Sequence, residues 1–184
     1  MKVNNIIIND VANFLTNDEN KKIKIINEFN QLETSELKDL MKLNPYIGGI
    51  IYHKDHYIIP LGYKENLFLN KFNIDNSFPS ICIEIYEEYA LCTSYDGNKQ
   101  LISITKDKIL SILNSLENRL ENYKVYYSYG SKAGEQAYKT GLTNIYEPLF
   151  LIIDYLSNNN YLNQNESLID GVNHLEEKVK RRIK

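Results

Sequence analysis

The chain has 184 residues and a net charge of −3, with 43% hydrophobic and 24% charged residues. This composition supports a packed core and excludes global disorder, and the length fits one domain, alone or with an appendage. The longest apolar run, Leu149–Ile153, is far shorter than the roughly 20 residues of a membrane-spanning helix, and the N-terminal region is too weakly apolar for a signal peptide. We therefore expect a cytoplasmic protein with no membrane partner.

The charges are unevenly distributed along the chain. The segment Lys178–Lys184 holds five basic residues and no acidic one, so residues 1–177 carry a net charge of −8. An acidic body repels phosphate backbones and attracts basic proteins. We therefore expect a basic protein partner, and no nucleic-acid binding except through the basic C-terminal tail.

The first 44 residues have apolar residues at helical spacing. Val11, Phe14 and Leu15 form a first short apolar face, and a second follows between Ile23 and Leu32. Thr34 or Ser35 can cap a third helix that ends before Pro45. We predict three helices here.

From Gly48 the spacing becomes that of β-strands, and turn residues separate the runs. Asp96-Gly97 predicts a type I′ hairpin turn, and Lys54–His56 predicts another turn. Residues 66–72 form a weaker strand candidate because their alternation is less regular. The predicted strands are Gly49–His53, Tyr57–Leu61, Ser80–Tyr86, Glu88–Tyr95 and Lys99–Ile104.

Helical spacing returns after Thr105. Farther along the chain we expect a strand over Val125–Tyr129, a short helix over Ser131–Tyr138 that ends at Gly141, and a buried helix that starts at Pro148. The last helix has a narrow apolar stripe, typical of a helix that lies against a partner surface. Its residues are Leu168, Val172, Leu175, Val179 and Ile183.

This order of elements predicts an α+β fold, in which N-terminal and C-terminal helices cover an antiparallel sheet of four to six strands at about residues 48–105. We predict that residues 1–160 form a single domain. Residues 161–184 are predicted to form an amphipathic helix with a basic end. Within it, residues 166–184 are a candidate homodimer interface.

The strongest candidate for a binding site is an acidic and aromatic hairpin tip. It contains Glu84, Tyr86, Glu87, Glu88 and Tyr89. Tyrosine offers a large apolar contact surface with a polar end, and carboxylates attract a basic partner. We predict that these five residues bind the partner.

A glycine-containing loop at residues 126–139 is a second candidate. A strand, a loop and a helix in this order can direct backbone N–H groups at a phosphate, so Ser131, Lys132 and Glu135 are candidate phosphate or ligand contacts. The loop does not match the P-loop pattern or the dinucleotide-binding pattern. A purely structural turn is the simpler interpretation.

The histidines and cysteines do not define a reactive centre. His53 and His56 lie on either side of a predicted turn with no obvious further metal ligands, and we interpret them as a polar hairpin tip. Cys82 and Cys92 fall on consecutive strands, where we expect them opposite one another as small buried side chains. No nucleophile and base are suitably spaced. We predict no metal, no cofactor and no catalytic residue.

Together these features favour a small intracellular protein-binding module over an enzyme. Frequent Asn, Lys and Ile and the 15 Tyr are typical of an AT-rich genome. Our leading hypothesis is an immunity-type or antagonist protein from an AT-rich bacterium or its phage, which neutralises a basic toxin or nuclease by surface complementarity. The alternatives are an enzyme or nucleotide-binding domain built around residues 126–139, and a structural subunit that oligomerises through its C-terminal helix.

Overall fold

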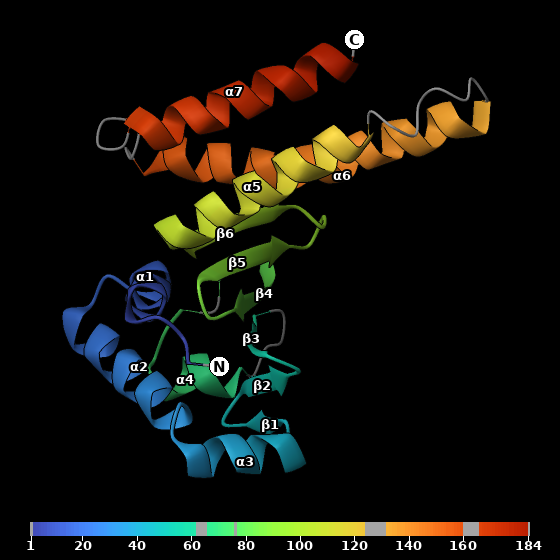
Figure 1. Cartoon of the computed structure of the whole chain (residues 1–184). Coiled ribbons are helices and arrows are strands. Elements are labelled where there is room, and N and C mark those ends of the chain that lie inside the picture. Colours follow the sequence, from blue (N-terminus) through green and yellow to red (C-terminus); the bar gives the residue numbers. More distant parts are fainter. Residues whose placement is uncertain (1, 62–65, 76, 124–131, 160–165, 184) are drawn as a thin grey trace. The chain divides into compact units, whose positions relative to one another are not determined.

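The computed structural model describes residues 2–61, 66–75, 77–123, 132–159 and 166–183. The chain divides into two compact units, Met1–Thr105 and Lys106–Lys184. This division differs from the predicted boundary after residue 160. The described part contains seven helices and one antiparallel sheet of six strands (Figure 1), which establishes the α+β fold class.

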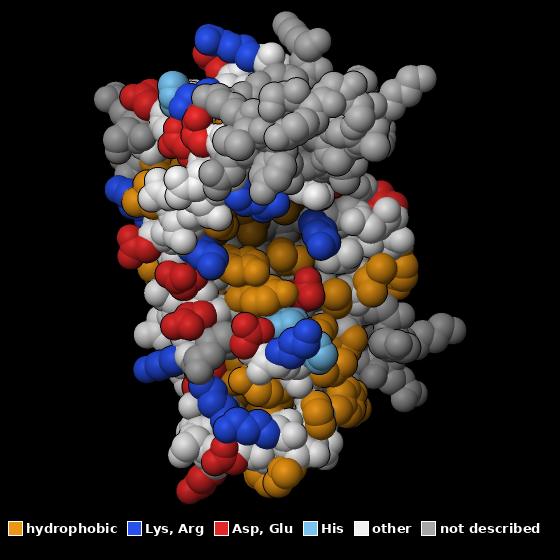
Figure 2. All heavy atoms as spheres, turned by 45° about the vertical axis from the view of Figure 1, so that its right-hand side comes forward, with side chains coloured by type: hydrophobic (Ala, Val, Ile, Leu, Met, Phe, Trp, Pro, Cys, Tyr) orange, Lys and Arg blue, Asp and Glu red, His pale blue; other side chains and the backbone are white. Residues whose placement is uncertain are grey.

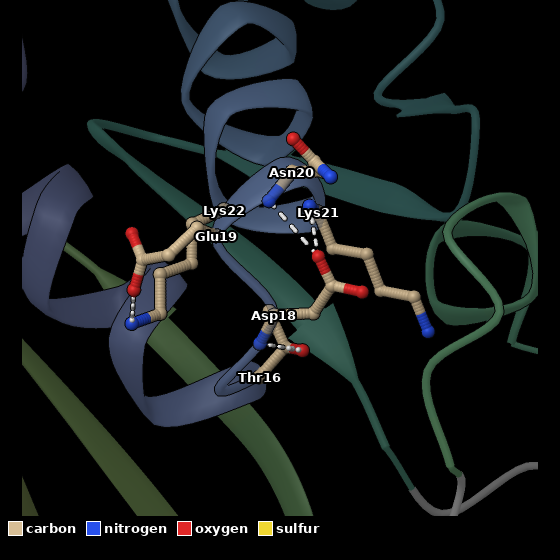
Figure 3. Close-up of polar contacts among 6 residues, drawn as sticks. All are labelled: Thr16, Asp18, Glu19, Asn20, Lys21 and Lys22. Carbon is tan, nitrogen blue, oxygen red and sulfur yellow. Dashed lines mark hydrogen bonds and ion pairs between the residues drawn. The ribbon is translucent and has the colours of Figure 1, made fainter.

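Three helices open the first unit, as the apolar spacing predicted. They are α1 (Asn5–Leu15), α2 (Glu19–Leu32) and α3 (Ser35–Leu43). The side chain of Asn4 accepts a hydrogen bond from the Ile6 backbone N–H at the start of α1. At the start of α2, the Oδ1 atom of Asp18 accepts from the backbone N–H groups of Asn20 (2.9 Å) and Lys21 (3.2 Å), as Figure 3 shows. These side chains pair N–H groups that have no partner within the helix itself.

The Asp18 cap supports a direct test. Asp18→Ala is expected to lower the free energy of unfolding by about 1 kcal/mol, because two backbone N–H groups lose their acceptor. Asp18→Asn keeps an acceptor oxygen and is expected to cost less. Urea denaturation of both variants measures the difference, and an equal loss in the two would show that charge, not the hydrogen bonds, stabilises this end of α2.

The six strands are paired in sequence order, from β1 to β6, and every pair is antiparallel. This meander confirms the three strands predicted over residues 80–104, which form two hairpins with β6 at the edge of the sheet. The strands are β1 (Tyr46–Ile47), β2 (Ile50–His53), β3 (His56–Pro60), β4 (Ser80–Ile85), β5 (Tyr89–Ser94) and β6 (Lys99–Ile104).

One face of the sheet packs against the helices of the first unit. This face contributes four almost fully buried side chains to a hydrophobic core shared with α1, α2 and α3. They are Tyr57 and Ile59 of β3 and Ile83 and Ile85 of β4. Because successive strand residues point to opposite faces, the side chains of His56, Ile58 and Glu84 lie on the other face.

Two local predictions were wrong. The weak strand candidate at residues 66–72 is instead a short helix, α4 (Leu67–Lys71), whose N–H groups at Phe68 and Leu69 are capped by the Asn66 side chain. The turn at Asp96-Gly97 is not of type I′, which requires a positive φ at both central residues. Only Gly97 has one, at +83°. The Gly97 N–H donates to the Ser94 carbonyl within a longer connection.

The described residues of the second unit form three helices that pack on one another: α5 (Lys106–Tyr123), α6 (Lys132–Asn158) and α7 (Glu166–Ile183). The helix expected to end at Gly141 continues through Gly141 and Pro148, so two predicted helices are one. Leu168, Val172, Leu175 and Val179 of α7 are buried, and α7 contacts both α5 and α6. The apolar stripe on which we based a homodimer is therefore covered within its own unit.

Candidate functional site

Two hairpin turns lie at the same end of the sheet in the first unit. Tyr57 of β3 is paired with Ile85 of β4, so the β2–β3 turn and the β4–β5 turn are neighbours. Two further segments are attached to the second turn. The Asn4 N–H donates to the Glu87 carbonyl (2.8 Å), and the Thr105 N–H donates to the Glu88 carbonyl (2.9 Å). This end of the sheet therefore brings together the start of α1, two turns and the end of β6.

Four aromatic side chains form a row across this end, here called the aromatic stack: His53, His56, Tyr86 and Tyr89. The Tyr86 ring lies parallel to Tyr89 with 4.3 Å between the ring centroids, and parallel to His56 at 4.4 Å. His53 is paired with His56 in the sheet and meets it edge to face. Aromatic neighbours on adjacent strands stabilise a sheet, so the stack holds the two turns in a fixed arrangement.

Two carboxylates flank the stack. The Nδ1 atom of His56 lies 3.4 Å from an Asp55 oxygen, and its Nε2 atom lies 3.7 Å from a Glu84 oxygen. Burial, and after it the charge of Glu84, raises the pKa of the Tyr86 and Tyr89 hydroxyls above the usual range. Because their pKa is raised, the two tyrosine hydroxyls stay neutral hydrogen-bonding groups beside the carboxylates. Figure 2 shows histidine side chains on a surface that also carries hydrophobic and acidic side chains.

Glu87 and Glu88 extend the negative charge along the second turn. Both line a shallow, solvent-open cavity of about 350 Å³ with residues 2–5. Glu87 is exposed, whereas Glu88 is half-buried. The cavity is lined mainly by polar groups, unlike the largely apolar pockets that enclose most small ligands. This geometry favours a surface for another macromolecule over a pocket for a metabolite.

The β2–β3 turn has an unusual backbone. Lys54 has a φ of +56°, a left-handed conformation that costs a residue with a Cβ atom about 1–2 kcal/mol. Such conformations are frequent at binding sites, where the surrounding structure enforces them.

The structure brings together all five residues predicted for the binding tip, but it corrects how they are exposed. We expected turn-tip side chains that bury little surface. Only Glu87 is exposed, and Glu84, Tyr86, Glu88 and Tyr89 are half-buried. The reason is that the tyrosine rings stack on each other and on His56, while Glu84 lies on the sheet face.

The sequence interpretation missed the part that the histidines play. His-Lys-Asp-His and Tyr-Glu-Glu-Tyr are the same pattern, two aromatic rings separated by two charged residues, and each pattern closes a hairpin. This repeated pattern was the one sign in the sequence that the histidines belong with the tyrosines. The pairing of β3 with β4 then places the two patterns side by side.

The second candidate site lies largely outside the described residues. Ser131 and the strand predicted over Val125–Tyr129 fall in the undescribed segment 124–131. Lys132 and Glu135 belong to α6, and the structure does not describe their side chains. The phosphate-site prediction therefore stays a prediction.

The two cysteines and three basic residues of the C-terminal tail can be placed in the structure. Cys82 is paired with Thr93, not with Cys92 as expected, because the register is offset by one residue. Both thiols are free, and burial raises the pKa of each, which disfavours the reactive thiolate. Lys178, Lys180 and Arg181 form ion pairs with Glu117, Glu176 and Glu177, which reduces the positive charge available to a nucleic acid.

Among the described residues, no group of three or more His, Cys, Asp or Glu side chains is arranged to hold a metal ion. Within the same ranges, no helix is both long and apolar enough to cross a bilayer.

Comparison of the chain with models of known protein families, with curated proteins and with solved structures finds no match.

Proposed function

We propose that this protein is a protein-binding module that docks a basic partner at the end of the sheet in its first unit. The docking surface, here called the aromatic–acidic surface, comprises His53–His56, Glu84 and Tyr86–Tyr89. The observation that carries the proposal is the fixed stack of four aromatic rings among four carboxylates, those of Asp55, Glu84, Glu87 and Glu88. Rigid aromatic groups supply contact area at low entropic cost, and carboxylates select a cationic partner.

The charge of the first unit supports this assignment. Residues 1–105 contain 14 acidic and 10 basic residues, whereas residues 106–184 contain 10 acidic and 11 basic ones. The negative charge of the chain therefore belongs to the unit that carries the surface, where it would speed the approach of a cationic protein. The specific form of the proposal is an antagonist, such as an immunity protein that blocks a basic toxin or nuclease.

The test uses two charge reversals of equal size. A photo-crosslinking residue at position 87 first identifies the partner, and association rates are then measured with the purified partner. Glu87→Lys is expected to slow association about tenfold at low salt and to weaken its salt dependence. Glu36→Lys, at an exposed position in the first turn of α3, changes the net charge equally and is expected to have little effect. Equal rates for the two variants would contradict the proposed surface.

A further inference from the structure

The aromatic–acidic surface has a titratable group at its centre. His56 is only 7% exposed, and its two ring nitrogens face different carboxylates, those of Asp55 and Glu84. The ring itself is stacked on Tyr86. The remaining titratable groups of the surface around it are His53 on β2, Lys54 in the first turn, Tyr89 on β5, and Glu87 and Glu88 in the second turn.

The charge of this ring decides how attractive the surface is to a cation. Histidine ordinarily changes its charge between pH 5 and 8, whereas aspartate and glutamate remain ionised there. A protonated His56 would place a positive charge between the two carboxylates and pair with them. Those carboxylates would then attract an incoming cationic side chain less strongly.

We infer that the aromatic–acidic surface releases cationic partners on acidification, because protonation of His56 neutralises the carboxylates that attract them. This inference rests on the proposed function and names its regulation. By thermodynamic linkage, a cationic partner must in turn oppose protonation of His56.

The experiment measures the affinity of the full chain for a fluorescent hexa-arginine peptide at pH 7.5 and pH 5.5. The peptide remains fully charged at both values. We expect the affinity to fall about three- to tenfold between them. His56→Gln, which cannot be protonated, is expected to lose the pH dependence. His174→Gln, an exposed histidine of α7, is expected to keep it.

The outcomes separate this inference from the proposed function. In one outcome, Glu87→Lys weakens peptide binding at pH 7.5, but the wild-type protein binds the peptide equally strongly at pH 7.5 and pH 5.5. This result overturns the inference and leaves the proposed docking surface in place. If Glu87→Lys leaves peptide binding unchanged, the peptide binds elsewhere on the protein. This result counts against both the proposed docking surface and its pH dependence. A pH dependence that persists in His56→Gln overturns the assignment to His56. Should that variant fold poorly, NMR of the wild-type protein decides alone, and His56 ring signals that do not change between pH 7.5 and pH 5.5 overturn the inference.

Discussion

Gly49→Ala is expected to destabilise the Met1–Thr105 unit by about 3 kcal/mol or more. Gly49 has a φ of +89°, and an added Cβ atom would lie 2.4 Å from the backbone nitrogen of Phe68. Phe68 is fully buried on α4, so neither the backbone of the helix nor the ring can move aside. The substitution combines an unfavourable backbone conformation with a steric conflict in the core.

The neighbouring Gly48 provides the matched control. Gly48 has a φ of +60°, but a Cβ atom there would meet nothing within 4 Å. Gly48→Ala is therefore expected to cost only the backbone term, about 1 kcal/mol. Urea denaturation monitored by circular dichroism measures both variants. If the two substitutions lower the free energy of unfolding equally, the steric conflict between the methyl group added at Gly49 and α4 does not contribute to the loss of stability.

Lys38→Met is expected to lower the free energy of unfolding by about 2–3 kcal/mol, because it leaves the Glu33 carboxylate buried without its cation. The Nζ atom of Lys38 lies 2.8 Å from a Glu33 oxygen, and the two side chains are 18% and 6% exposed. The same oxygen accepts the Val3 N–H, which fixes the segment before α1. Burial, followed by interactions with Glu33, raises the pKa of the neighbouring Tyr57 hydroxyl.

A second ion pair on α3 isolates the effect of burial. Lys42 and Asp39 are also 2.8 Å apart, but they are 64% and 71% exposed. Lys42→Met is expected to leave stability nearly unchanged, since water solvates both charges in the folded and unfolded chain. The two ion pairs have the same N–O distance and differ in how deeply they are buried. Equal losses of stability would show that burial of Glu33 does not govern the energetics.

Helices and strands with regular apolar spacing could be predicted from the sequence, because their own residues determine them. The three N-terminal helices and the strands over residues 80–104 are of this kind. The helix at Leu67–Lys71 is not, since its cap, Asn66, is also held from outside the helix by a hydrogen bond to the Pro60 carbonyl. Within α6, Gly141 and Pro148 indicate helix ends locally, but burial of the apolar residues after Pro148 outweighs a local cost of about 1–3 kcal/mol.

The candidate site was predictable only in part, for the same physical reason. Glu84–Tyr89 are contiguous in the sequence, so their acidic and aromatic character could be recognised directly. His56 lies 30 residues before Tyr86, and only the pairing of β3 with β4 stacks the two rings. A single sequence does not encode that register in any local pattern. The histidines therefore looked like an isolated polar turn.

The shortness of β1 limits how this protein can assemble with itself. A strand at the edge of a sheet presents unpaired N–H and C=O groups, on which further chains can add and grow into fibrils. Here the β1 edge is two residues long, although it carries the exposed side chain of Tyr46 and follows the exposed Leu43. An incoming strand would find too few backbone partners on β1 to remain attached. The β1 edge can therefore keep exposed apolar side chains without acting as a template for aggregation.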